Sequence, residues 1–147
     1  MKNIITIVIL FFTYAFSANN DPVYSDKGMV VSTSLQASEA GIEILKKGGN
    51  AVDAAVAVGF ALAVTSPSNG NIGGGGFMVS ATESGQFFTL DYREKAPASG
   101  HRDMFLNDSG NVIKGMSLYS RAAAGVPGSV DGLLKALNDH GSGNITI

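Results

Sequence analysis

Cysteine is absent from the 147-residue sequence, which excludes disulfide bonds, thiolate catalysis and cysteine-based zinc sites. Charged residues make up only 15% of the chain, the net charge is −2 and there is no basic run. Nothing therefore suggests a nucleic acid or an anionic membrane surface as a partner. Apolar residues reach 45%, a composition typical of one globular domain with a sizeable core.

The sequence also lacks the residue patterns of two common kinds of catalytic centre, a metal site and a serine-hydrolase site. His101 and His140 are far apart and have no spacing typical of metal ligands, so we expect no metal site. The sequence contains no Gly-x-Ser-x-Gly segment, which leaves a serine hydrolase of that class unsupported.

The N-terminal segment has the features of a signal peptide. Lys2 precedes an apolar run, Ile4 to Phe12, and small residues that suit signal peptidase lead to Ser17. The apolar run is shorter than the roughly 20 residues that span a membrane. We expect residues 1–17 to be a signal peptide, although an uncleaved anchor is the alternative. Residues 18–147 should then be exported, periplasmic or secreted, with no membrane segment in the mature form.

Hydrophobic periodicity predicts an α+β chain. The expected elements are a short strand over 29–32, helices over 35–47 and 51–64, hairpin strands over 77–82 and 86–92, and a last helix that carries Val130 to Leu137. The helix over 51–64 is apolar all round except for Asp53, which predicts a buried helix with a helix-start charge. The hairpin has apolar residues on both faces, as in a sandwiched sheet, and residues 99–124 are less regular.

Four consecutive glycines, Gly73 to Gly76, separate the buried helix from the hairpin. Such a run has a high entropic cost, and we expect it where the backbone adopts φ > 0 or where another group approaches closely. It is not a P-loop, because no Gly-Lys-Ser/Thr follows. A dinucleotide fingerprint lies between a strand and a helix, the reverse of this order. We expect no cofactor; a structural turn and a cradle for substrate or a loop remain open.

Arg93 is the best single candidate for a binding residue. It lies at the end of the second hairpin strand, with Asp91 and Glu94 nearby. A surface ion pair, worth about 0–1 kcal/mol, is the simpler interpretation. The alternative is a guanidinium fork that binds a substrate carboxylate. The residues alone favour the simpler interpretation.

Taken together and in order, seven segments covering about residues 26–141 resemble the γ-glutamyltranspeptidase family. They are Gly28-Met-Val-Val-Ser32, Ala37-Ser-Glu-Ala-Gly41, Leu45-Lys-Lys-Gly-Gly-Asn-Ala-Val-Asp-Ala-Ala-Val-Ala57, Gly73-Gly-Gly-Gly-Phe-Met78, Asp91-Tyr-Arg-Glu-Lys-Ala-Pro97, Arg102-Asp-Met-Phe105 and Gly125-Val-Pro-Gly128.

The resemblance implies part of an αββα N-terminal-nucleophile hydrolase sandwich, here incomplete. It also implies a precursor that cleaves itself into a large and a small subunit, with the new N-terminal Thr of the small subunit as nucleophile and its α-amine as base. The activity would transfer the γ-glutamyl group of glutathione or another γ-glutamyl donor, through a γ-glutamyl-enzyme, to an amino acid, a peptide or water.

By this resemblance, Arg93 matches the arginine that binds the α-carboxylate of the donor, which reverses the preference stated above. The family's Thr-Thr-His-type segment, and the Gly-Gly and Ser-Ser segments that complete its substrate pocket, have no counterpart in this sequence. We therefore expect residues 18–147 to be a truncated N-terminal portion of the large subunit, with no catalytic residue of its own, inactive without its small subunit. The alternatives are a related acylase, a poly-γ-glutamate-processing enzyme, or a non-catalytic exported module that binds carboxylates.

Overall fold

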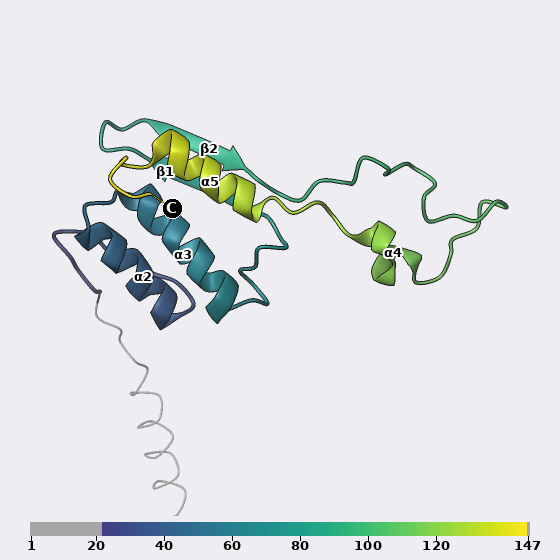
Figure 1. The fold of residues 1–147 in the computed structure, drawn as a ribbon, viewed down its shortest axis with the longest axis horizontal. Coiled ribbons are helices and arrows are strands. Elements are labelled where there is room, and N and C mark those ends of the chain that lie inside the picture. Colours follow the sequence, from purple (N-terminus) through teal and green to yellow (C-terminus); the bar gives the residue numbers. More distant parts are fainter. Residues whose placement is uncertain (1–21, 147) are drawn as a thin grey trace, which may run out of the picture.

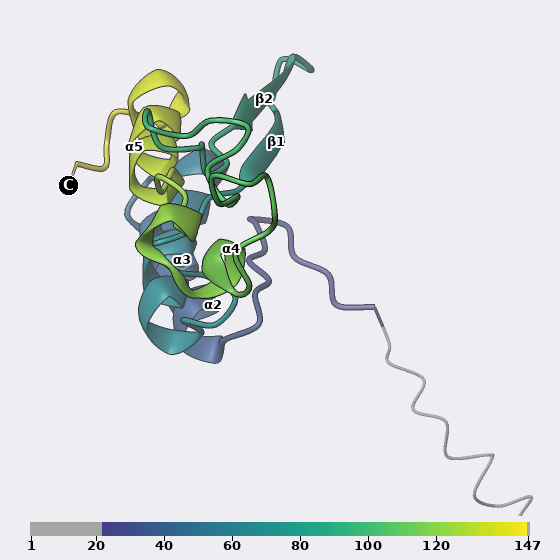
Figure 2. The ribbon, with the colours of Figure 1, turned by 90° about the vertical axis from the view of Figure 1, so that its right-hand side faces the viewer.

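The computed structural model describes residues 22–146, and the predicted signal peptide lies outside them. The elements are α2 (Leu35–Lys46), α3 (Ala51–Thr65), β1 (Phe77–Ala81), β2 (Phe87–Asp91), α4 (Met116–Tyr119), the 3-10 turn η1 (Arg121–Ala123) and α5 (Ser129–His140). The helices α2, α3 and α5 lie together, with the hairpin alongside α5 (Figure 1). Figure 2 shows the hairpin beside the upper end of the helices. No helix in the described part of the chain is long and apolar enough to cross a membrane.

The helix boundaries follow from local capping, and both predicted N-terminal helices are confirmed. The Ser34 side chain caps α2, and Gly48, at φ +85°, provides the left-handed residue that ends it. Asn50 and Asp53 form a capping box at the start of α3, in which the Asp53 carboxylate accepts the Asn50 N–H at 2.7 Å. The last helix is also confirmed as α5, with Gly141 at its C-cap.

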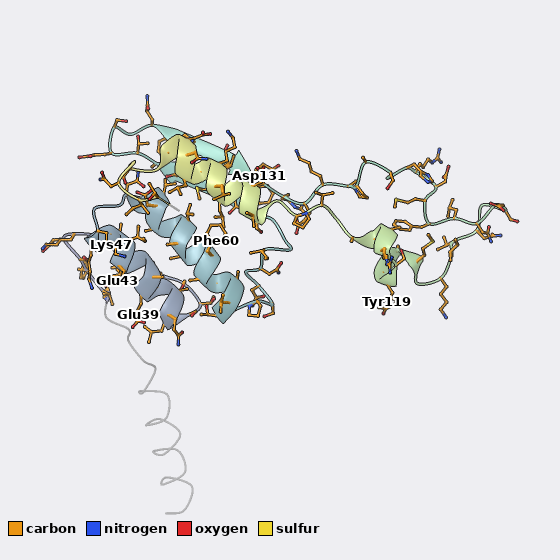
Figure 3. The ribbon with its side chains drawn as sticks, in the orientation of Figure 1. Glu39, Glu43, Lys47, Phe60, Tyr119 and Asp131 are labelled. Atoms are coloured by element: carbon orange, nitrogen blue, oxygen red, sulfur yellow. The ribbon has the colours of Figure 1, made fainter. Side chains whose placement is uncertain are left out.

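The predicted hairpin is confirmed as the antiparallel pair β1–β2, with Phe77 opposite Asp91 and Ala81 opposite Phe87. Because successive side chains of a strand point to opposite faces, the hairpin has two different sides. The inner face packs against the core of α3 and α5 through Met78, Phe88 and Leu90. Buried Val52, Val56, Leu133 and Ala136 form that core, and Phe60, labelled on α3 in Figure 3, packs against it.

The other side of the hairpin, called the open face below, bears Phe77, Val79 and Phe87. These side chains are 64%, 76% and 79% exposed. The prediction of apolar residues on both faces is therefore correct, but only one face is covered within the described residues.

Two sequence predictions are wrong in the described chain. Residues 29–32 do not form a strand. Val30 instead packs at Gly41 of α2, and no neighbouring strand of the described chain supplies backbone hydrogen bonds to this segment. The α3 helix is not buried all round either: Val52 and Val56 are buried, whereas Val64 is 81% exposed. A uniformly apolar helix needs cover on every side, and α2 and α5 cover only part of its circumference.

Residues 96–126, called the arm below, project away from the helices (Figure 1). The arm is closed at its base by reciprocal backbone hydrogen bonds between Lys95 and Val126, at 3.1 and 2.8 Å. It contains α4 and η1 but is otherwise irregular, as predicted. Tyr119, labelled on α4 in Figure 3, is 88% exposed.

Candidate functional site

Arg93 follows the end of β2 by two residues and belongs to the open face. The strand alternates so that Phe88 and Leu90 point inward, and Tyr92 continues this inward series while Arg93 is exposed. The Arg93 backbone N–H donates to Asp91 Oδ1 at 3.0 Å. This local turn fixes the main chain just where the strand ends.

The guanidinium of Arg93 is held only loosely by its neighbours. Its Nε lies 3.9 Å from Glu94 Oε2, and its Cζ lies 5.9 Å from the centroid of the Phe77 ring. The side chain is 65% exposed, and the guanidinium donates no hydrogen bond to any residue in the described range. A guanidinium has five N–H donors in a planar fork, so the donors of Arg93 are available to an anion that approaches from the open face.

The glycine run lies directly beside this residue. Gly74 O accepts hydrogen bonds from the backbone of Gly128 and Ser129, at 2.8 and 3.0 Å, and so joins the run to the start of α5. Gly76 extends the hairpin by pairing with Tyr92, whose N–H donates to Gly76 O at 3.0 Å.

The structure explains the glycine run by close approach rather than by unusual backbone angles. None of Gly73 to Gly76 has a positive φ. A Cβ at Gly75 would lie 2.5 Å from Tyr92 O and 2.7 Å from Arg93 Cα. The chain's own backbone therefore fills the space beside the run.

Two pockets flank the exit of β2. One, of about 290 Å³, is lined by Gly74, Gly75, Tyr92 and Glu94 among others. The second, of about 320 Å³, lies toward α5 and includes Arg93, Lys95, Asp131 and Lys135; Asp131 is labelled on the first turn of α5 in Figure 3. Arg93 is thus accessible from a concave surface as well as from the open face. Burial raises the pKa of the Tyr92 phenol above its ordinary value.

The other residues considered in the sequence, Asp53 and the two histidines, do not lie with Arg93 in one site. Asp53 is 1% exposed and starts α3, as predicted. It also accepts the N–H of Ser142 at 3.0 Å, a long-range contact that the sequence did not reveal. Burial alone would raise the pKa of Asp53, but hydrogen bonds from Ser142 and Asn50 outweigh it and hold that pKa below its ordinary value.

The two histidines lie apart. His140 stacks on Phe88 with ring centroids 3.7 Å apart, whereas His101 is exposed in the arm. No group of three or more His, Asp or Glu side chains that could hold a metal occurs in residues 22–146.

Comparisons with known proteins agree with one another. The sequence profile of the family described as Gamma-glutamyltranspeptidase matches residues 37–146. The glutathione hydrolase proenzyme of Escherichia coli (strain K12) is 53% identical over 121 residues, which make up 82% of this chain and 21% of that protein. This chain thus spans about a fifth of the length of that curated relative.

Solved structures give the same result. The γ-glutamyltranspeptidase of Helicobacter pylori matches with a TM-score of 0.77 and 47% identity, covering 83% of this chain and 35% of that one. A γ-glutamyltranspeptidase from Pseudomonas nitroreducens, complexed with L-DON, matches with a TM-score of 0.73 and 50% identity, covering 81% of this chain and 35% of that one.

Proposed function

The chain belongs to the γ-glutamyltranspeptidase family, and we propose that it is the N-terminal part of the large subunit of an exported γ-glutamyltransferase and glutathione hydrolase. The identity of 53% to a glutathione hydrolase proenzyme supports this activity. On this proposal, residues 1–17 are the signal peptide and residues 18–147 form part of an αββα sandwich. The open face of the hairpin is the side on which further chain would pack.

Arg93 is the donor-binding residue of the proposed enzyme. The observation that carries this assignment is that the Arg93 side chain is 65% exposed on the open face, while its guanidinium donates no hydrogen bond to any of the described residues. A carboxylate can accept two parallel N–H bonds from such a fork, and charge-assisted pairs of this kind are about twice as strong as neutral hydrogen bonds. Glu94, at 3.9 Å from Nε, is too far away to occupy the fork itself.

The chemistry then divides between this chain and a small subunit. In the proposed reaction, a threonine hydroxyl of the small subunit attacks the γ-carbonyl of glutathione, and the cysteinylglycine amine leaves with a proton. The resulting γ-glutamyl ester is attacked by an amino acid, a peptide or water, which frees the hydroxyl again. This chain supplies the Arg93 fork, which binds the α-carboxylate and directs the γ-carbonyl toward the nucleophile.

Calorimetric titration of the purified chain with glutathione tests the role of Arg93. The matched ligand is a glutathione analogue whose glutamyl α-carboxylate is replaced by hydrogen. We expect the chain to bind glutathione more tightly than the analogue, and Arg93→Lys to remove this preference, because lysine keeps the charge but loses the fork. Arg102→Lys is the control, since the Arg102 side chain is 96% exposed in the arm. Equal affinity of the unmodified chain for both ligands would contradict the assignment.

A turnover assay tests the division of labour. The purified chain alone should release no p-nitroaniline from a γ-glutamyl anilide, because its proposed role is to bind and not to attack. Release would mean that a nucleophile lies within the 147 residues. Binding of γ-linked oligoglutamate in preference to glutathione would favour the poly-γ-glutamate-processing alternative. Binding without turnover, even when a family small subunit is added, would favour the non-catalytic module.

A further inference from the structure

Tyr92 occupies an unusual position between the glycine run, the start of α5 and Arg93. Its side chain points inward, and its main chain pairs with Gly76 in both directions. The ring is half-buried, and no side-chain hydrogen bond of its hydroxyl occurs in the described range. The Tyr92 side chain is therefore held by close packing and not by hydrogen bonds to the described residues.

Four glycines from two distant segments form this surrounding, called the glycine socket below: Gly75, Gly76, Gly128 and Gly132. A Cβ at Gly76 would lie 2.9 Å from Tyr92 Cε2, and one at Gly132 would overlap Tyr92 Cβ and Cγ. At Gly75 and Gly128 a Cβ would collide with the Tyr92 carbonyl oxygen. None of the four has a positive φ. Only glycine fits at these four positions, because any side chain there would collide with Tyr92.

The socket bears on Arg93 because the two residues share a peptide plane. That plane is rigid and includes the Arg93 N and Cα atoms, so contacts that fix the Tyr92 carbonyl also fix the point at which the Arg93 side chain leaves the backbone. The guanidinium has only distant contacts of its own, at 3.9 Å to Glu94 and 5.9 Å to the Phe77 ring. With no close contact of its own, the guanidinium depends for its placement on where the backbone holds the Arg93 Cα atom.

We infer that Tyr92, seated in the glycine socket, is a positioning residue that aims the Arg93 fork at the carboxylate of the substrate. The inference rests on the proposed function, which makes Arg93 the carboxylate-binding residue. It also explains why three separate sequence segments meet at one place: the glycine run, the strand exit and the Gly-Val-Pro-Gly segment all contribute to the placement of Arg93. A bound carboxylate gains affinity when its receptor is already ordered, because less conformational freedom is lost on binding.

The first test measures the order of the Arg93 side chain without any ligand. ¹⁵N relaxation of the Arg93 Nε–H group in the full chain should report a more ordered group than that of Arg102, which is 96% exposed and serves as internal reference. Tyr92→Phe should keep this order, because the ring still fills the socket. Tyr92→Ala should bring Arg93 to the mobility of Arg102. Unchanged Arg93 mobility in Tyr92→Ala would overturn the inference.

Because Tyr92→Ala could unfold the chain, a second pair of variants makes smaller changes. Gly76→Ala would press on the outer atoms of the Tyr92 ring, which can shift, whereas Gly73→Ala, in the same run, would meet only Asn71 Oδ1 at 3.3 Å. We expect Gly76→Ala to loosen Arg93 partway and Gly73→Ala to leave it ordered. Equal effects of the two would mean that the glycines act on general stability and not through Tyr92.

The second test separates this inference from the proposed function. Tyr92→Ala should reduce the preference for glutathione over the analogue that lacks the α-carboxylate by about tenfold, or 1.4 kcal/mol. In the Arg93→Lys background it should have no further effect, since residues that act through one another are not additive. No preference in the unmodified chain contradicts the proposed function. A preference that survives Tyr92→Ala contradicts only the positioning role.

Discussion

The two faces of one hairpin have different roles although both carry large apolar side chains. Phe88 and Phe87 are neighbours in sequence, yet Phe88 packs against the core and stacks on His140, whereas Phe87 is 79% exposed. Arg93 continues the exposed series and Tyr92 the packed one. One face therefore stabilises the hairpin on the helices, and the other presents the candidate binding residue.

The largest effect should come from truncation on the inner face. Phe88→Ala removes a ring that contacts the core, and we expect it to lower the free energy of unfolding by about 3 kcal/mol, near the lower end for a buried phenylalanine. Phe87→Ala is the matched control and should change it by no more than about 0.5 kcal/mol. Urea unfolding of both variants provides the comparison, and equal losses would show that the faces are not energetically distinct.

A smaller loss is expected where the glycine run meets the strand exit. Gly75→Ala would place a methyl group 2.5 Å from Tyr92 O, so the backbone must move, at a cost of about 1–3 kcal/mol. Gly73→Ala should be nearly neutral because its Cβ would meet one side-chain oxygen at 3.3 Å. Thermal unfolding measured for the pair would contradict this account if Gly73→Ala were the more harmful change.

The contribution of Asp53 should depend on pH. Its pKa in the folded chain lies below the ordinary 3.8, so its stabilising effect is complete above the pKa of the unfolded chain and is lost as pH falls through the folded value. Asp53→Asn should therefore destabilise the chain at pH 6, and the difference from the unmodified chain should narrow below pH of about 4.

Urea midpoints at a series of pH values measure this difference. Asp108→Asn is the control, because Asp108 is exposed in the arm. A difference between Asp53→Asn and the unmodified chain that stays constant from pH 6 to pH 3 would show that the charge of Asp53 has no part in it.

The smallest effect on stability should come from the open face. Val79 is 76% exposed, and Val79→Lys should leave the free energy of unfolding within about 0.5 kcal/mol of its original value. We expect copies of the chain to associate through the exposed apolar side chains of this face, and Val79→Lys should reduce that association, because a charge on an exposed sheet opposes pairing between molecules. Light scattering measures this; Val112→Lys, in the arm, should have no such effect. If Val112→Lys reduced self-association more than Val79→Lys did, the open face would not be the surface through which the chains associate.

Local signals in the sequence were sufficient for most of the secondary structure. Asn50 and Asp53 form the capping box where the sequence predicted a helix start, and Gly48 ends α2 in the left-handed conformation. The alternation in β1 and β2 predicted the hairpin. Each of these features depends on residues only a few positions apart, which is why periodicity and capping residues suffice to predict it.

Features that depend on distant residues could not be predicted in this way. The expected strand over 29–32 has suitable residues but no partner strand among those described, and the Asp53–Ser142 hydrogen bond joins positions 89 residues apart. Arg93 was identified as a candidate by its place at a strand end and by family resemblance. Its exposure on the open face, and the glycine socket behind it, became evident only from the packing of α5 against the strand exit.

Because the arm is closed at its base, a change in the length of the arm need not alter the candidate site. Because Lys95 and Val126 are joined by two backbone hydrogen bonds, the main chain leaves and re-enters at a single point. Doubling the number of residues in a flexible loop costs only about 0.6 kcal/mol of closure entropy. We therefore expect insertions and deletions between these two residues to leave the relative geometry of the strand exit and the start of α5 unchanged.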